Sequence, residues 1–316
     1  MNYKNVYVSV VIPTWNGKDL IKNCLASLMK QTYKDFEIIV TDNGSTDGSV
    51  ELIEKDYPET KVVQMGTNKG FSVPVNEAIR NAKGEYIALL NNDVEVDPNW
   101  LQELKGALKR NPEVGFCSSK MLFMKRRDII NEICHSFRID GRSEPTGLEE
   151  KDCGQYEEEK LIFGACGGAA IYRRSMLKEI GLFDEDYFMY AEDVDLDFRA
   201  QLAGYKCLYV PTAIAYHESM GTAGHMTYAY FTTKNALNVL VKDMPLLLLL
   251  KYLPYILWGQ YKQARVYAIK GMIYPLITGQ LGALRQVAKM LLKRNVIQGK
   301  RIVSLRYLES IFKREI

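Results

Sequence analysis

The sequence predicts an α/β fold in which helices flank a mostly parallel sheet, followed by a helical C-terminal region. Apolar, β-branched runs alternate with helical patterns four times in the first 110 residues, as in the βα units of a parallel sheet. Polar residues follow each run, at the sheet edge where open α/β proteins bind ligands. From about residue 226 the pattern becomes helical and markedly apolar. We therefore expect an α/β domain over residues 1–225 and a helical region over residues 226–316.

The four βα units follow one another along the chain. Residues 6–12 (VYVSVVI) predict a strand, and the turn residues from Pro13 to Gly17 end it. Apolar residues between Leu20 and Leu28 then recur at helical spacing. The same alternation predicts strands at 36–42, 61–65 and 86–93, and helices from Ser49, near 72–82 and at 97–110.

Later parts of the chain can extend this sheet. The stretch at 141–160 is acidic and too polar to pack, which predicts a surface loop or mobile lid. In the tract at 191–206 (AEDVDLDFRAQLAGYK), apolar residues lie four apart, which predicts a helix. The additional strands are expected near 114–123, 161–171 and 205–216.

The composition is that of an ordinary globular chain. Hydrophobic residues make up 47% and charged residues 25% of the 316 residues, which excludes a collagen, a disulfide miniprotein and a disordered tail. The six cysteines include no CxxC pair, so we expect a reduced chain inside the cell. No long apolar stretch precedes Pro13, and we expect neither a signal peptide nor an N-terminal membrane anchor.

Charge is distributed unevenly along the chain. Residues 218–316 hold 15 Lys and Arg against 4 Asp and Glu, a net charge of +11, and this leaves −8 on residues 1–217. The asymmetry predicts that the C-terminal part meets an anionic partner, either nucleic acid or a membrane surface. A solvated basic face is the alternative.

Asp42 ends the predicted strand at 36–42 and precedes a turn rich in Gly, Ser, Thr and Asp. Helix capping explains Asp47 or Ser49 in this turn but does not explain Asp42. A carboxylate at a strand tip can accept the imide N–H of a uracil or thymine ring. A solvated turn residue is the alternative for this tract alone.

Asn91, Asn92 and Asp93 follow the buried run YIALL and place amide and carboxylate oxygens at the same sheet edge. Oxygen ligands suit Mg²⁺ or Mn²⁺, which neutralise a diphosphate. An Asx turn before the next helix is the alternative.

One of the three histidines lies at a position where a metal ligand is expected. His217 ends the last predicted strand, where a neutral imidazole could complete a metal site begun by Asp93. A structural hydrogen-bonding role is the alternative. His135 and His225 lack such a placement, and we assign them no role.

The helix predicted at 191–206 starts with a crowd of acidic residues that includes Glu192 and Asp193. The helix dipole favours acidic residues in a first turn and explains part of this pattern. It does not explain the preceding YFMY, whose aromatic rings would place a carboxylate against an apolar wall. Desolvation there raises a carboxyl pKa toward that of a useful general base.

Six tracts together resemble family 2 glycosyltransferases, in the order in which that family has them. The tracts are VVIPTWNG, DNGSTDGS, NKGFSVPVNEAI, LLNNDVEVDPNWL, GACGGAAIYRR and GLFDEDYFMYAEDVDLDFRAQLAGYK. The resemblance covers roughly residues 7–220 and is greatest to the rhamnosyltransferase-type branch. It implies a GT-A fold and a metal-dependent, inverting transfer of a hexose from a nucleotide-diphosphate donor to an acceptor hydroxyl.

The resemblance also implies roles by position. Asp193 matches the catalytic base, and Asp93 and His217 match residues that would hold Mg²⁺ or Mn²⁺. Asn91 replaces the first Asp of the family's DxD motif, which concentrates the charge offered to the metal on Asp93. The positions expected to bind the nucleotide sugar are Pro13, Thr14, Asn16, Asp42, Asn68, Gly70, Asn91 and Asn92. Those expected on the acceptor side are Gly167, Gly168 and Glu192.

The resemblance to the rhamnosyltransferase-type branch implies dTDP-rhamnose as the donor and a lipid-linked or polysaccharide acceptor in cell-surface glycan biosynthesis. A polyprenyl-phosphate sugar synthase is one alternative, in which a lipid phosphate replaces the hydroxyl. A catalytically silent scaffold is the other, and the joint presence of the acidic residues and His217 argues against it.

The C-terminal region has features typical of peripheral membrane proteins. Residues 244–258 form an apolar run of 15 residues that contains Pro245 and Pro254, whereas a spanning helix needs about 20. Nearby aromatic and cationic residues favour a segment lying in the membrane interface. From Arg285 onward, basic residues alternate with apolar ones, as in helices on anionic lipid. We expect peripheral attachment to the cytoplasmic face of the membrane. A dimerisation arm is the alternative, and nucleic acid fits less well because no recognition fold is evident.

Overall fold

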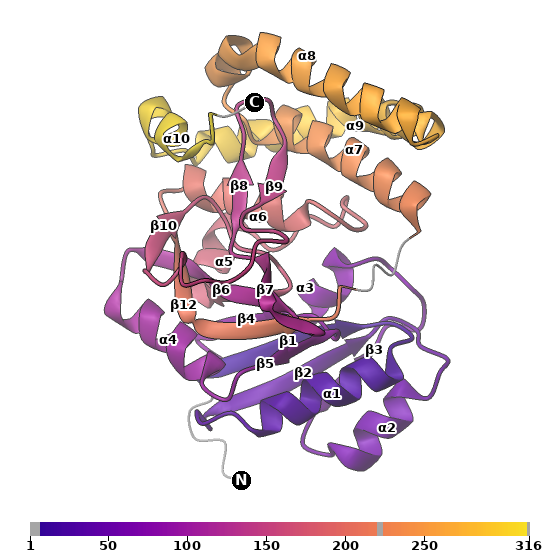
Figure 1. Ribbon diagram of the computed structural model, residues 1–316, viewed down its shortest axis with the longest axis vertical. Coiled ribbons are helices and arrows are strands. Elements are labelled where there is room, and N and C mark those ends of the chain that lie inside the picture. Colours follow the sequence, from indigo (N-terminus) through magenta and orange to yellow (C-terminus); the bar gives the residue numbers. More distant parts are fainter. Residues whose placement is uncertain (1–6, 220–223, 315–316) are drawn as a thin grey trace.

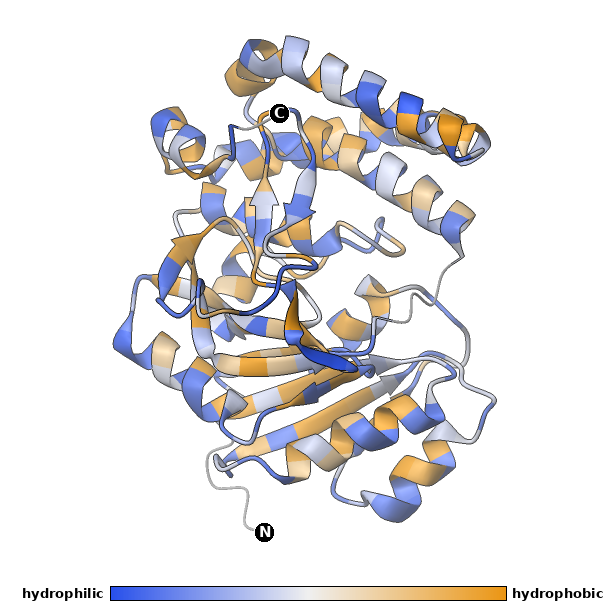
Figure 2. Cartoon of the chain, viewed as in Figure 1, coloured by the Kyte–Doolittle hydropathy of each residue, from blue (hydrophilic) through white to orange (hydrophobic). Residues whose placement is uncertain are grey.

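The computed structural model describes residues 7–219 and 224–314 and shows a central sheet with helices on both faces and a layer of C-terminal helices beyond it (Figure 1). Strands β1 and β4 are buried along almost their whole length, as expected of a sheet covered on both faces, and Figure 2 shows hydrophobic residues along the sheet. The parallel strands of the N-terminal half lie in the order β4 (Tyr86–Leu90), β1 (Val8–Thr14), β2 (Phe36–Asp42) and β3 (Lys61–Gln64).

Two hydrophobic cores lie on opposite faces of this sheet. Val8, Val10 and Ile12 of β1 enter one core, and Val11 enters the other, because successive side chains of a strand point to opposite faces. The helices on the first face are α1 (Lys18–Met29), α2 (Ser49–Asp56) and α4 (Trp100–Arg110). Those on the second face are α3 (Ser72–Asn81), α5 (Arg174–Ile180) and α6 (Glu192–Leu202).

Beyond β4 the sheet becomes mixed. Strand β11 (Ala169–Arg173) runs antiparallel between β4 and β6 (Val114–Phe123), and β12 (Lys206–His217) runs parallel to β6. The short antiparallel strands that join the sheet are β5 (Val94–Val96), β7 (Arg126–Glu132) and β10 (Lys160–Ile162). A separate antiparallel pair is formed by β8 (His135–Phe137) and β9 (Ser143–Pro145).

The predicted α/β architecture is confirmed, and its differences from the sequence analysis are local. The run at 86–93 ends as a strand at Leu90, and the run at 161–171 is divided between β10 and β11. Strands β7 and β8 were not predicted. β7 forms a hairpin with β6, and β8 pairs with the nearby β9. β7 (RRDIINE) begins with three charged residues and β8 (HSF) has only three residues, so local periodicity does not reveal them.

Residues 141–160 are mostly exposed, which confirms the predicted surface loop, and polar contacts fix this loop on the sheet. Lys120 is buried in β6, and its Nζ lies 2.7 Å from Asp152 Oδ2 and 2.6 Å from Glu157 Oε1. The Tyr209 hydroxyl also donates to the Tyr156 carbonyl at 3.0 Å. Polar contacts therefore hold this segment against the sheet in place of apolar burial.

The helical C-terminal region is also confirmed, and it shares a core with the α/β domain. Phe137, Phe163 and Phe198 of the α/β domain pack in one cluster with Leu240 and Leu248. The described helices of this region are α7 (His225–Lys242), α8 (Leu246–Ile269), α9 (Ile273–Gly299) and α10 (Leu305–Ile311). Helix α7 starts at His225 and packing is continuous between the two regions, so a division into domains at 225/226 stays a prediction.

Helix α8 is apolar on two sides. Leu248, Tyr252 and Ile256 are buried against the rest of the protein. The apolar residues that α8 leaves exposed include Leu246, Leu247, Leu250, Leu253, Leu257, Trp258 and Tyr261. Figure 2 shows hydrophobic residues along this helix, the uppermost in the view. Within the described ranges, no helix is long and apolar enough to cross a membrane.

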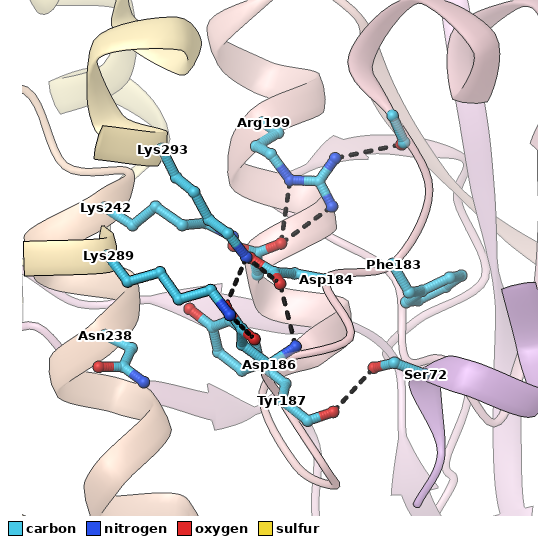
Figure 3. A network of polar contacts seen from close by, with 12 residues as sticks. Ser72, Phe183, Asp184, Asp186, Tyr187, Arg199, Asn238, Lys242, Lys289 and Lys293 are labelled. Carbon is cyan, nitrogen blue, oxygen red and sulfur yellow. Dashed lines mark hydrogen bonds and ion pairs between the residues drawn. The ribbon is translucent and has the colours of Figure 1, made fainter. Parts of the chain in front are cut away.

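Ion pairs fasten the C-terminal helices to the segment that precedes α6 (Figure 3). Lys242 Nζ of α7 lies 2.5 Å from Asp184 Oδ2 and also contacts Asp195 of α6. Lys293 of α9 reaches Asp184 at 2.5 Å and Asp186 at 2.7 Å, and Lys289 reaches Asp186 at 2.5 Å. Burial alone would raise the pKa of Asp184, but Lys242 and Lys293 outweigh it and lower that pKa.

Replacing Lys242 by Met is expected to lower the free energy of unfolding by about 3–5 kcal/mol, because it leaves buried carboxylates without their counter-charge. The Lys242 side chain is 1% exposed. Lys289→Met is the matched control, because the Lys289 side chain is 58% exposed and such pairs contribute about 0–1 kcal/mol. Urea unfolding of both variants measures the difference. Equal, small losses would contradict a structural role for Lys242.

Candidate active site

A cavity of about 410 Å³ opens at the carboxyl ends of β1 and β4, where ligands bind in open α/β sheets. Six of the eight positions predicted to bind the nucleotide sugar line it. They are Pro13, Thr14, Asn68, Gly70, Asn91 and Asn92. We call this space the donor cavity. Gly70 is required for its shape, because φ is +81° there and a Cβ would lie 2.1 Å from the Phe188 carbonyl oxygen.

The other two predicted positions, Asn16 and Asp42, do not line the donor cavity. Asn16 Oδ1 accepts a hydrogen bond from the Thr46 backbone N–H at 2.8 Å. The Asp42 carboxylate accepts hydrogen bonds from the backbone N–H groups of Gly44 and Ser45, each at 3.2 Å. Both side chains therefore hold the turn after β2 beside the cavity. A direct contact of either with the nucleotide stays a prediction.

The tip of β4 forms the inner wall of the donor cavity. Asn92 Nδ2 donates to the Thr14 hydroxyl at 2.9 Å, which joins the tips of β1 and β4. Gly17 permits this contact, because a Cβ there would lie 2.5 Å from Asn92 Nδ2. Asn91 Oδ1 is buried and has no hydrogen-bond partner among the residues that the structure describes. The amide oxygen of Asn91 thus has an unused hydrogen-bonding capacity beside the cavity.

Asp93 and His217 lie together, as the sequence predicts. Asp93 Oδ2 is 3.2 Å from His217 Nε2, because β5 pairs antiparallel with the end of β12. Asn131 Oδ1 lies 2.9 Å from the other ring nitrogen, Nδ1, and this outer contact fixes the ring orientation. One carboxylate and one imidazole fit Mn²⁺ or Mg²⁺ whose remaining ligands come from a diphosphate and water.

A second cavity, of about 520 Å³, adjoins the first. We call it the acceptor cavity. Gly167, Gly168, Glu192 and Asp193 line it, and their roles on the acceptor side and as the base stay predictions. The two cavities share Phe71, Asn91 and Met189 in their walls. A group bound in one cavity can therefore reach a group bound in the other.

Asp193 is positioned by a strained turn. Tyr190 and Ala191 have φ of 67° and 63°, a left-handed conformation that is costly for residues with a Cβ. Buried Asn235 of α7 stabilises this turn, because its Nδ2 donates to the carbonyls of Met189 and Tyr190 at 2.9 and 2.8 Å. The turn places Asp193 at the start of α6, where Oδ2 accepts a hydrogen bond from the Gly167 N–H at 3.1 Å.

Glu192 is the member of the ED pair that the structure buries more deeply. Its side chain is 7% exposed, and Oε2 lacks a hydrogen-bond partner within the described part of the chain. Burial, reinforced by the charge of Asp193, raises the pKa of Glu192 to about 8. Burial thus favours the neutral form of Glu192.

His135, to which the sequence analysis assigns no role, lies beside Asp193. His135 Nδ1 is 3.7 Å from Asp193 Oδ2 and 3.7 Å from Asp197 Oδ2, and Nε2 is 3.1 Å from Glu132 Oε1. Burial opposes the imidazolium, but these carboxylates outweigh it and raise the pKa of His135. His135 begins the unpredicted strand β8, and no sequence pattern indicates its approach to α6.

The C-terminal helices complete the acceptor cavity. Tyr228 and Thr232 of α7 and Gln263 and Tyr267 of α8 contribute to its wall. Tyr228 also packs edge-on against Tyr190, with ring centroids 4.9 Å apart. The C-terminal region is thus part of the site, which the sequence analysis did not foresee.

Residues 9–181, more than half of the chain, match the family model described as Glycosyl transferase family 2. The chain belongs to glycosyltransferase family 2. This glycosyltransferase is 29% identical over 226 residues to the O-antigen biosynthesis protein RfbC of Myxococcus xanthus, an alignment that covers 67% of the chain and 17% of RfbC. It is also 29% identical over 241 residues to the N-acetylglucosaminyl-diphospho-decaprenol L-rhamnosyltransferase of Mycobacterium tuberculosis, covering 68% of the chain and 77% of that enzyme.

A solved structure shows the same fold. The mannosyltransferase PcManGT from Pyrobaculum calidifontis, in complex with GDP-Man and Mn²⁺, superposes on the glycosyltransferase with a TM-score of 0.57 and 17% sequence identity. The alignment covers 93% of this chain and 87% of PcManGT. The GT-A fold that the sequence predicts is therefore confirmed.

Asp93→Ala is expected to remove the effect of Mn²⁺ on nucleotide binding. In the unsubstituted protein, Mn²⁺ should tighten nucleoside diphosphate binding about tenfold or more, a gain of about 1.4 kcal/mol. Calorimetry with dTDP, UDP and GDP, in Mn²⁺ or in EDTA, measures this difference. Glu95→Ala is the control, because Glu95 is near Asp93 in sequence but outside the donor cavity. A metal effect that survives in Asp93→Ala would exclude Asp93 as a ligand.

Proposed function

We propose that this glycosyltransferase transfers a sugar, with inversion, from a nucleotide-diphosphate donor to a hydroxyl of a lipid-linked or polysaccharide acceptor in cell-surface glycan biosynthesis. The observation that carries the proposal is the junction of the two cavities at Asn91. Asp93 and His217 lie on the donor side of this junction, and Asp193 lies on the acceptor side. A leaving diphosphate and an attacking hydroxyl would thus approach the sugar from different sides.

Asp193 acts as the general base in this proposal. It takes the proton of the acceptor hydroxyl while that oxygen forms a bond to the anomeric carbon of the donor sugar. The bond between the anomeric carbon and the diphosphate oxygen breaks on the opposite face, and its electron pair stays with the diphosphate. The hydrogen bond from Gly167 to Oδ2 orients the carboxylate. A single displacement of this kind inverts the configuration and needs no covalent intermediate.

Asp93 and His217 would hold the divalent cation, which supplies positive charge to the leaving diphosphate when it is bound. Asn131 keeps the His217 ring oriented. The solved structure of PcManGT holds Mn²⁺ together with its nucleotide sugar, GDP-Man, which supports a divalent ion as the cofactor here. Mg²⁺ has the same preference for oxygen ligands.

Rhamnose from dTDP-rhamnose is the proposed donor sugar. The support is the M. tuberculosis relative, whose name specifies a rhamnosyltransferase acting on a diphospho-decaprenol-linked sugar. The same resemblance to a rhamnosyltransferase disfavours the alternative of a polyprenyl-phosphate sugar synthase.

We further propose that the exposed apolar side of α8 lies on the cytoplasmic face of an anionic membrane. Stacked Trp258 and Tyr261, with Lys262 Nζ 5.7 Å from the Trp258 ring, give α8 the aromatic and cationic residues typical of the interface. The same helix lines the acceptor cavity through Gln263 and Tyr267. Contact with the membrane would therefore place the cavity beside a lipid-linked acceptor.

Asp193→Asn is expected to lower turnover by about 10²–10⁴, because the variant loses the base but keeps its shape. Transfer from dTDP-rhamnose to an N-acetylglucosaminyl-diphospho-lipid measures turnover, and a thermal-shift assay checks that donor binding persists. Glu192→Gln is the matched control. Because burial favours the neutral form of Glu192, its amide should retain turnover within about tenfold. An Asp193→Asn enzyme that also stays within about tenfold would remove Asp193 as the base.

Leu250→Asp combined with Leu257→Asp is expected to weaken binding to anionic phosphatidylglycerol vesicles about tenfold or more, because two exposed leucines no longer enter the lipid. Flotation with these vesicles and with neutral phosphatidylcholine vesicles measures the change. Met29→Asp is the control, since Met29 is an exposed apolar residue of α1. Unchanged flotation of the double variant, with a loss of dimer on size exclusion, would identify this face as a dimer interface.

A further inference from the structure

Three potential metal ligands of different chemistry converge on the acceptor cavity. Glu132, His135 and Cys166 each offer an atom, and these atoms all lie within 4.8 Å of one another. Glu132 ends β7, His135 begins β8, and Cys166 lies in the loop between β10 and β11. The backbone N–H of His135 donates to the Gly164 carbonyl at 3.1 Å, and this contact brings the cysteine loop to the other two residues.

Polar atoms around these ligands are buried without hydrogen-bond partners. Glu132 is 8% exposed, and its Oε1 lies 3.1 Å from His135 Nε2 without forming a hydrogen bond in the described ranges. His135 Nδ1 and both carboxylate oxygens of Asp197 also lack a hydrogen bond there. Gly164 admits Asp197 to the cluster, because a Cβ there would lie 1.9 Å from Asp197 Oδ2. Buried polar groups are normally satisfied, and an ion bound by the Glu132 carboxylate would supply the partner that this group lacks.

We propose that Glu132, His135 and Cys166 form a Zn²⁺ site in the wall of the acceptor cavity. A thiolate, an imidazole and a carboxylate are the three ligand types that Zn²⁺ takes in proteins. All three residues line the cavity, so the fourth tetrahedral position faces the open space and would hold water. The set is distinct from Asp93 and His217, which offer no thiolate and suit a harder ion.

The surroundings of His135 determine which ring nitrogen binds the ion. Nε2 lies 3.1 Å from Glu132 Oε1, close to the roughly 3.4 Å that separates two ligand atoms at tetrahedral zinc distances. Nδ1 faces Asp193 and Asp197, each at 3.7 Å, so its N–H points to carboxylates. A metal-bound histidine usually donates its second N–H to such a group. The cysteine sulfur needs to approach by about 1 Å, and two glycines follow Cys166 in its loop.

An ion at this position would lie next to Asp193 and would occupy part of the acceptor cavity. We therefore expect zinc loading to slow sugar transfer by hindering the acceptor. This consequence, unlike the zinc site itself, rests on the proposed function.

Metal binding to the full chain, freed of metal with a chelator, tests the proposal without a substrate. Co²⁺, a spectroscopic substitute for Zn²⁺, is expected to give a near-ultraviolet thiolate-to-cobalt charge-transfer band at one equivalent, which Zn²⁺ then removes. Cys166→Ser should abolish the band and weaken Zn²⁺ binding at least about 100-fold, more than the loss of an outer contact costs. Cys153→Ser is the control, because Cys153 is an exposed cysteine outside the cavity. A band that persists in Cys166→Ser, or no band in the unsubstituted protein, would overturn the site.

Two further variants separate this inference from the proposed function. Asp93→Ala should retain the cobalt band while losing the Mn²⁺ effect on nucleotide binding. His135→Gln should lose the band, with circular dichroism used to confirm that it folds. If the enzyme transfers sugar with Asp193 as base but shows no cobalt band, the zinc site is contradicted and the proposed function is not.

Discussion

The pairing of buried carboxylates before and within α6 with lysines of the C-terminal helices is the interaction on which the site depends. Lys242 pairs with Asp184 and Asp195 at the same time, and α6 begins with the ED pair only a few residues away. The intervening turn holds two consecutive left-handed residues, each of which costs about 1–3 kcal/mol. Asn235 and the ion pairs offset this cost. The C-terminal helices therefore act as part of the catalytic scaffold and not only as an attachment to it.

This arrangement also changes the meaning of the charge asymmetry. The acidic α/β part and the basic C-terminal part are complementary to each other, and several basic residues that suggest a lipid surface contact the protein itself. Lys289 and Lys293 pair with the acidic segment, Arg294 donates to the Val241 carbonyl and Lys300 to the Glu179 carbonyl. Membrane attachment would thus depend more on the exposed apolar side of α8 than on net charge.

The parts of the structure that local patterns encode could be predicted, and those created by long-range pairing could not. The βα units and the polar strand tips follow from periodicity, so Asn91, Asn92 and Asp93 are found from the sequence, and the family resemblance adds Asp193. His135 enters the site only because β8 meets the loop at Gly164, and Asn235 does so only because α7 packs on the turn before α6. Asp42 shows a further limit, since its position at the tip of β2 is predictable but its bonding to the adjacent turn is not.

The central claim is that one carboxylate, Asp193, promotes a single displacement across the junction of the two cavities. The configuration of the new glycosidic bond tests it most directly. NMR of the purified product, through the coupling between the anomeric carbon and its proton, assigns that configuration relative to the donor. The account predicts an anomeric configuration opposite to that of the nucleotide sugar. A product that retains the donor configuration would require a second displacement or a different mechanism, and would contradict the role given to Asp193.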